Sequence, residues 1–238
     1  MNRHLIRCAN YFGQKYKGVV SGASNILISN RNETISLVGK DLYSTLWNLY
    51  HNHNNVSKDI KRITIGGDHS VSIASVAWTL NNFPKSKVIW IDAHADINTY
   101  EESKSKNFHG MPLSFLTGLD YNFKFDFIKN RLSLKNLMYV GIRDLDPFEE
   151  SVIKSNGIKY VNVNDFNKNN FEEIYNFIGD DTYHLSFDVD SIDPTFIPCT
   201  GTPVDNGLDL ESFQNFFDFK CRNFLTIFVS KGFREKAF

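Results

Sequence analysis

The sequence predicts an α/β fold in which a mostly parallel β-sheet is covered by helices. Short apolar runs, rich in β-branched and aromatic residues, alternate with stretches of helical periodicity. Acidic residues and histidines follow directly after several of these runs, and in open parallel sheets ligands collect at the carboxyl ends of the strands. The chain has 238 residues, 42% of them hydrophobic, and neither a linker nor an internal repeat divides it. We therefore expect a single domain over residues 1–238.

The strands are predicted from apolar runs that end at glycine or at polar residues. Residues 87–92, with the sequence KVIWID, are typical of a strand buried within a sheet. Residues 62–66 form a shorter run that stops at a pair of glycines. The predicted strands are residues 62–66, 87–92, 137–142, 158–163, 183–187 and 224–230.

The helices are predicted between the strands. Apolar residues recur at helical spacing from Val71 to Trp78, and Pro84 marks a break after them. The asparagine-rich stretch 51–55 (HNHNN) is predicted to be a solvated loop, and a metal site at its two histidines is the less favoured interpretation. The predicted helices are residues 71–82, 147–155, 171–178 and 209–219.

Composition excludes several classes of partner. The formal net charge of −1 gives no indication of binding to nucleic acid or to an anionic membrane surface. No apolar run approaches the roughly 20 residues that span a bilayer, and the first ten residues do not resemble a secretory signal. The three cysteines are few, odd in number and widely spaced, which argues against a disulfide framework and suits a reducing compartment. We expect a cytoplasmic protein without nucleic-acid or membrane partners.

Three segments place carboxylates and histidines after predicted strands: residues 66–70 (GGDHS), 92–96 (DAHAD) and 186–191 (SFDVDS). Residues two apart on an extended chain share a face, so the polar side chains of one segment can point at one place. A single aspartate after a strand is commonly a turn former or a helix cap, but three such segments with two histidines favour a metal site. Carboxylate with imidazole and without thiolate suits Mn²⁺-like ions. The candidate metal ligands are His69, Asp92, His94, Asp96, Asp188 and Asp190.

These segments, together with residues 109–112 (HGMP) and 201–204 (GTPV), resemble the ureohydrolase superfamily and its arginase family in particular. The resemblance covers roughly residues 66–208. It implies a three-layer α/β/α sandwich, a homo-oligomer (a trimer in this family) and a pair of Mn²⁺ ions at the strand ends. By the resemblance, one ion would be held by His69, Asp92, Asp96 and Asp188, and the other by Asp92, His94, Asp188 and Asp190.

The resemblance also implies an activity, the manganese-dependent hydrolysis of L-arginine to L-ornithine and urea. Because a guanidinium carbon is a poor electrophile, the reaction needs hydroxide, which two metal ions sharing one water can supply at neutral pH. His109 resembles the family histidine that passes a proton to the departing amine, a task that suits an imidazole.

Substrate recognition is partly indicated by the same resemblance. Asn98 and Ser105 correspond to the residues that bind the α-carboxylate of the substrate, and Asp146 to the residue that binds its α-amino group. The alternatives for these three are an Asx turn, an exposed loop and a helix cap. Lys106 stands where the family usually has glycine.

The chain departs from the family pattern near its C-terminus. In the family, the last strand carries a glutamate that binds the guanidinium group, but residues 224–230 (FLTIFVS) contain no acidic residue, and the one later glutamate is Glu235. We therefore expect the C-terminal strand and helices to be incomplete. Two functions stay open: an arginase, or a relative acting on another guanidino compound, and an arginase-like metal-binding protein with impaired catalysis.

Overall fold

The structure, a computed structural model, describes residues 3–15, 17–25, 32–220 and 224–230. Its centre is an eight-stranded sheet with the strand order β2-β1-β3-β8-β7-β4-β5-β6, in which every pair of neighbours is parallel. The strands are β1 (Arg3–Cys8), β2 (Glu33–Ile35), β3 (Lys61–Gly66), β4 (Lys87–Ile91), β5 (Leu137–Val140), β6 (Lys159–Val161), β7 (Tyr183–Asp188) and β8 (Phe224–Ser230).

Helices connect the strands and cover the sheet. The α-helices are α1 (Val19–Asn25), α2 (Leu42–Asn54), α3 (Ser72–Asn82), α4 (Pro112–Thr117), α5 (Pro147–Asn156), α6 (Val163–Asn167), α7 (Glu172–Ile178) and α8 (Leu210–Lys220). Short 3₁₀ turns are η1 (His69–Val71), η2 (Phe108–Gly110), η3 (Leu134–Asn136) and η4 (Val189–Ser191).

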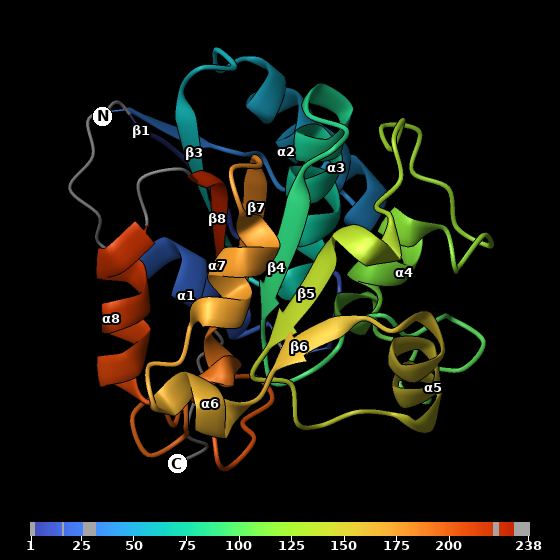
Figure 1. Ribbon diagram of the computed structural model, residues 1–238. Coiled ribbons are helices and arrows are strands. Elements are labelled where there is room, and N and C mark those ends of the chain that lie inside the picture. The colour runs from blue at the N-terminus through green and yellow to red at the C-terminus, as the bar shows by residue number, and fades with distance from the viewer. Residues whose placement is uncertain (1–2, 16, 26–31, 221–223, 231–238) are drawn as a thin grey trace.

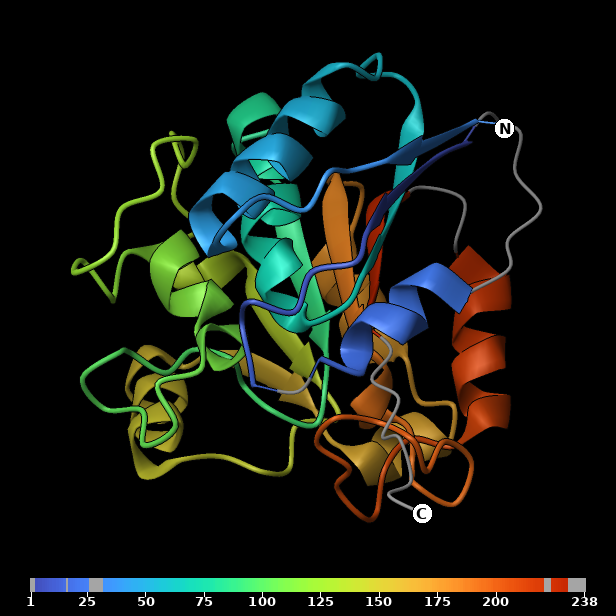
Figure 2. The ribbon, with the colours of Figure 1, turned by 180° about the vertical axis from the view of Figure 1, so that it is seen from behind.

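Both faces of the sheet are buried, as the alternating side chains of β4 show. Val88 and Trp90 belong to a core formed with α2, α3, α4 and α5, whereas Ile89 and Ile91 belong to a core formed with α6, α7 and α8. Figures 1 and 2 show α2 and α3 behind the sheet in the first view and in front of it in the second. The predicted parallel α/β fold and the three layers implied by the resemblance are confirmed.

The predicted elements occur in the structure with shifts of a residue or two, with one exception. The stretch 51–55 was expected to be a solvated loop, and this is wrong, because α2 extends to Asn54. His53 is fully buried, and its Nε2 lies 3.1 Å from the Thr64 hydroxyl, so tertiary contacts hold this polar sequence in a helix. The predicted strand 158–163 is shorter, because Asn162 accepts a hydrogen bond from Asp165 N–H and begins α6.

The register of the sheet brings the ends of the central strands to one level. Gly66 at the end of β3 pairs with Ser230 of β8, and Ser230 pairs with Asp188 at the end of β7. Ile91, the last residue of β4, pairs with Phe187. The segments that follow β3, β4 and β7 therefore start side by side. Among the described residues, no helix is long and apolar enough to cross a membrane.

Candidate metal centre

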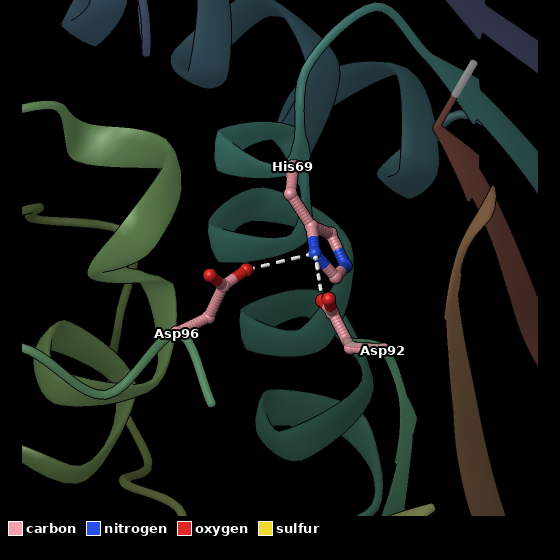
Figure 3. A group of neighbouring side chains, drawn as sticks. All are labelled: His69, Asp92 and Asp96. Carbon is pink, nitrogen blue, oxygen red and sulfur yellow. Dashed lines mark ion pairs between the residues drawn. The ribbon is translucent and has the colours of Figure 1, made fainter. Parts of the chain in front are cut away.

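Carboxylates from two strand ends converge on one ring nitrogen of His69. The Nδ1 atom of His69 lies 2.9 Å from Asp92 Oδ2, 2.8 Å from Asp96 Oδ2 and 3.3 Å from Asp188 Oδ2. Figure 3 shows Asp92 and Asp96 pointing at this nitrogen from different stretches of chain. His69, Asp92 and Asp96 are buried, and their ligand atoms all lie within 4.8 Å of one another. We call these three residues the first ligand group.

A second ligand group consists of Asp92, His94 and Asp190, whose ligand atoms also lie within 4.8 Å of one another. The Nδ1 atom of His94 is 3.4 Å from Asp92 Oδ1 and 3.4 Å from Asp190 Oδ2. Asp92 therefore directs one carboxylate oxygen to His69 and the other to His94. The Thr202 hydroxyl donates to Asp190 Oδ2 at 2.7 Å, which fixes that carboxylate.

Local sequence explains how His69 reaches this place. The turn after β3 passes so close to the N-terminal segment that a Cβ atom on Gly67 would lie 1.9 Å from the carbonyl oxygen of Asn10. Only glycine allows this approach. Asp68 then caps η1 by accepting from Ser70 N–H, and His69 is the first residue of that turn.

Two residues that the sequence analysis did not identify hold the His69 ring. The Nε2 atom of His69 lies 2.8 Å from the Ser186 hydroxyl, and its ring stacks on Trp90 with the centroids 4.2 Å apart. The indole of Trp90 also donates to Asp92 Oδ2 at 3.1 Å. Each of these residues stands two positions before a candidate ligand, Asp92 or Asp188, on the same face of a strand, and that spacing is the signal that could have found them.

The prediction assumed that the segments carrying the ligands are extended, so that residues two apart share a face. In the structure these segments form turns instead. Asp96 has a φ of 49°, in the left-handed region, and residues 189–191 form η4. Asp92 Oδ1 accepts from His94 N–H at 2.9 Å, and Asp188 Oδ1 accepts from Asp190 N–H at 3.3 Å. The aspartates thus form turns after the strands, and these turns bring the side chains together.

The charges of the centre fit a cation. Burial and repulsion from Asp190 and Asp92 raise the pKa of Asp188 well above its usual range. Burial and repulsion from Asp92 likewise raise the pKa of Asp96 to about 7. Oδ1 of Asp190 is buried and has no hydrogen-bond partner among the residues that the structure describes. A divalent ion would remove the repulsion and bind this oxygen, and the carboxylate and imidazole donors suit such an ion.

His109 lies in η2, beside the loop that carries Asp96. Its backbone N–H donates to the Gly13 carbonyl at 3.1 Å, and the neighbouring Gly110 carbonyl accepts from Asn98 N–H at 3.3 Å. Burial, together with positive charge on His94 and His69, lowers the pKa of His109 to about 4. The imidazole is therefore neutral at neutral pH.

The structure joins two of the three predicted substrate residues. Asn98 Nδ2 donates to Asp146 Oδ2 at 2.8 Å, whereas the exposed Ser105 accepts from Asn107 N–H in its own loop. Lys106 has a φ of 57°, so it adopts the left-handed conformation that glycine favours. Its ammonium donates to the Tyr100 and Glu101 carbonyls.

Glu149 of α5 binds the backbone next to Asn98 and the backbone of Asp146, a role that the sequence analysis did not identify. One of its carboxylate oxygens accepts from Ile97 N–H at 3.2 Å and the other from Asp146 N–H at 3.0 Å. Glu149 is 6% exposed, and burial raises the pKa of its carboxyl group to about 7. One carboxylate thus links the backbone beside Asn98 to the backbone of Asp146.

Comparisons with known proteins agree with this geometry. The model of the arginase family matches residues 20–227, which is most of the chain. The chain belongs to the arginase family. It is 43% identical to an arginase of Neurospora crassa over an alignment of 173 residues, which covers 66% of this chain and 48% of that protein.

Solved arginase structures have the same fold. The arginase of Entamoeba histolytica in complex with L-ornithine superposes with a TM-score of 0.87 at 29% identity, covering 97% of this chain and 92% of that one. The arginase of Bacillus caldovelox superposes with a TM-score of 0.89 at 23% identity, covering 99% and 93%, and at this identity it shows the fold alone. In sequence, the chain spans about half the length of the Neurospora relative.

The strand without an acidic residue occupies a central place in this arginase fold. β8 lies between β3 and β7, and therefore between the strands that precede His69 and Asp190. It pairs with β7 over residues 224–230 and with β3 over residues 226–230. Glu235 lies outside the described residues, so the expectation that the C-terminal helices are incomplete is not tested.

Proposed function

We propose that the chain hydrolyses L-arginine to L-ornithine and urea with two Mn²⁺ ions. The observation that carries the proposal is the position of Asp92, whose two oxygens face two histidines in two ligand groups. A carboxylate placed in this way suits a ligand shared by two ions. The donors are oxygen and imidazole without thiolate, which favours Mn²⁺ over softer ions.

The six candidate ligands would hold the ion pair. By the resemblance, His69 and Asp96 belong to one ion, His94 and Asp190 to the other, and Asp92 and Asp188 to both. When bound, the ions would activate water for attack on the guanidinium carbon. The carboxylates of Asp92 and Asp190 are buried and held by hydrogen bonds, so they need little rearrangement during the reaction.

Other residues would position the substrate and move protons. One amide N–H of Asn98 is engaged by Asp146, and the second is available to the α-carboxylate of arginine. Asp146 would accept from the α-ammonium, and Ser105 would reach the carboxylate from its loop. The neutral imidazole of His109 would accept a proton and pass it to the departing amine.

A second candidate function is metal binding with weak catalysis. It is favoured by β8, which has no acidic residue in its sequence although it lies between the strands that lead to the ligands. A guanidinium is best oriented by a carboxylate that accepts two of its hydrogens. Without that carboxylate, a misplacement of about 1 Å costs on the order of 10²-fold in rate.

Urea release by the purified, Mn²⁺-loaded chain tests both candidates. We expect about two Mn²⁺ per chain, a melting temperature raised by Mn²⁺ because the ion binds the folded state, and loss of both effects in Asp188→Asn. Activity with preference for L-arginine over agmatine, which lacks the α-carboxylate, would support arginine hydrolysis. The second candidate would be supported if the chain binds metal but releases no urea, and if grafting a full-length family C-terminus after Leu208 restores urea release. One zinc, or no metal, after preparation in excess Mn²⁺ would contradict both.

We further propose a homo-oligomer in the cytoplasm. The family resemblance supports the oligomer, and light scattering on the purified chain measures it. Few and widely spaced cysteines support a reducing compartment, and among the described residues Cys8 and Cys199 are free thiols.

A further inference from the structure

All five N–H donors of the Arg143 side chain are directed at backbone carbonyl oxygens. Arg143 follows β5, and its guanidinium lies at the carboxyl edge of the sheet. Nε donates to Asp205, Nη1 to Gly141 and Ser191, and Nη2 to Asp190 and Val204, with donor–acceptor distances of 2.7 to 3.2 Å. A planar fork of five donors has the geometry for this task, and a lysine ammonium does not.

These carbonyls belong to the chain segments that form the second ligand group. The Arg143 guanidinium holds Asp190 by its backbone, and Thr202, in the segment just before Val204, holds the Asp190 side chain. The backbone of Arg143 also contributes, because its N–H donates to the Ala93 carbonyl at 2.8 Å, beside His94. One residue therefore connects the backbone next to both ligands that are specific to the second group.

The Arg143 guanidinium is directed at the backbone and not at the carboxylates of the second group. Among the described residues, its hydrogen-bond partners are neutral carbonyls and it forms no ion pair with a carboxylate. Its contribution to the second group is therefore to hold the backbone of the segments that carry the ligands.

We propose that Arg143 is the positioning residue of the second ligand group and determines whether that group binds its ion. The inference rests on the proposed two-ion centre. It assigns to Arg143 a role that is separate from the first ligand group, because the five hydrogen bonds of its guanidinium go to Gly141, the 190–191 segment and the 204–205 segment.

Arg62 provides a matched control. Its guanidinium is also buried and also binds backbone carbonyls, that of His53 in the last turn of α2 and those of Val56, Ser57 and Ile60 after it. Its ring partner is Trp78, with the guanidinium carbon 3.6 Å from the ring centroid. None of these contacts involves a candidate metal ligand, so Arg62→Lys reports what the loss of a buried guanidinium does to the fold in general.

The experiment is a Mn²⁺ titration of the full chain by calorimetry, with metal counting and electron paramagnetic resonance, on wild type, Arg143→Lys, Arg143→Met, Arg62→Lys and Asp190→Asn. We expect wild type and Arg62→Lys to bind two ions with the signal of a coupled pair. Both Arg143 variants should resemble Asp190→Asn. They should still bind the first ion, and their affinity for the second should be about 10- to 100-fold weaker, the usual effect of losing a residue that orients a ligand.

Circular dichroism establishes that each variant is folded, and Arg143→Lys carries the test if Arg143→Met does not fold. Two ions with wild-type affinity in Arg143→Lys would overturn the inference and leave the proposed function intact. If the Arg143 variants lose affinity for both ions equally, or if Arg62→Lys loses as much affinity as they do, the effect is a general structural one and the inference is overturned as well. A wild-type chain that binds one ion would overturn the inference together with the two-ion centre.

Discussion

Replacing Glu149 with glutamine should stabilise the fold relative to wild type as the pH rises, and at the same time impair arginine binding. The carboxylate is buried, and its hydrogen-bond partners among the described residues are the neutral backbone N–H groups of Ile97 and Asp146. Burial raises its pKa from 4.5 to about 7. Since the folded state favours the neutral acid, stability is highest at low pH and falls as the pH rises from about 4.5 through about 7. Glutamine resembles the neutral acid in size and stays neutral at every pH.

The size of the effect follows from the pKa difference. A rise from 4.5 to about 7, at about 1.4 kcal/mol for each pKa unit, corresponds to on the order of 3 kcal/mol. Little discount for solvent is needed, because the residue is 6% exposed. Relative to wild type, the free energy of unfolding of Glu149→Gln should therefore increase by on the order of 2 to 3 kcal/mol between pH 5 and pH 8.

Urea denaturation followed by circular dichroism at pH 5 and pH 8 measures this difference, and comparing variants at each pH cancels the titration of the metal ligands. Glu150→Gln is the control, because Glu150 is the next residue of α5 and is exposed, so a change of about 0.5 kcal/mol or less is expected. Glutamine places an N–H₂ group where an oxygen now accepts from Ile97 or Asp146, so KM for arginine should rise. A stability difference that does not change between the two pH values would refute the reasoning.

Three further predictions concern single side chains. Ser186→Ala should weaken Mn²⁺ binding about 10- to 100-fold in calorimetry, because the serine hydroxyl orients His69, whereas the buried Ser75→Ala should have little effect. Asn98→Ala should lower kcat/KM for arginine and leave that for agmatine nearly unchanged, and equal losses on both substrates would assign Asn98 a purely structural role. Arg62→Lys should lower the free energy of unfolding by on the order of 2 kcal/mol in urea denaturation, because carbonyls after α2 lose their donors, and an unchanged value would contradict this.

The central strands could be predicted because they are buried on both faces and read as continuous apolar runs. β4 is the clearest example, and its predicted range differs from the observed one by a single residue. β1 was missed because charged and apolar residues are mixed in Arg3–Cys8, and β2 because it has three residues. α2 was missed because its last turn is rich in histidine and asparagine, and it is stabilised by a capping box at Asp41 and by the buried contacts of His53.

The candidate ligands could be predicted as a group because each follows a strand, and parallel register places those strand ends together. The residues that hold the ligands were not predictable in the same way. Arg143 and Glu149 bind backbone atoms of segments far away in the sequence, and a backbone carbonyl or N–H leaves no residue pattern to recognise. Such partners are found only once the chain is folded.

The two interpretations of an aspartate after a strand, turn former and metal ligand, are not alternatives in this fold. A carboxylate has two oxygens, and Asp92 uses Oδ1 to accept from His94 N–H while Oδ2 faces His69. Asp188 does the same, with Oδ1 on Asp190 N–H and Oδ2 toward His69. The hydrogen bond that forms the turn also fixes the orientation of the other oxygen, so a residue needed for the local fold is already aimed before an ion binds. Asparagine at either position could keep the turn through its amide oxygen but would lose the charge, which is why Asp188→Asn separates metal binding from folding.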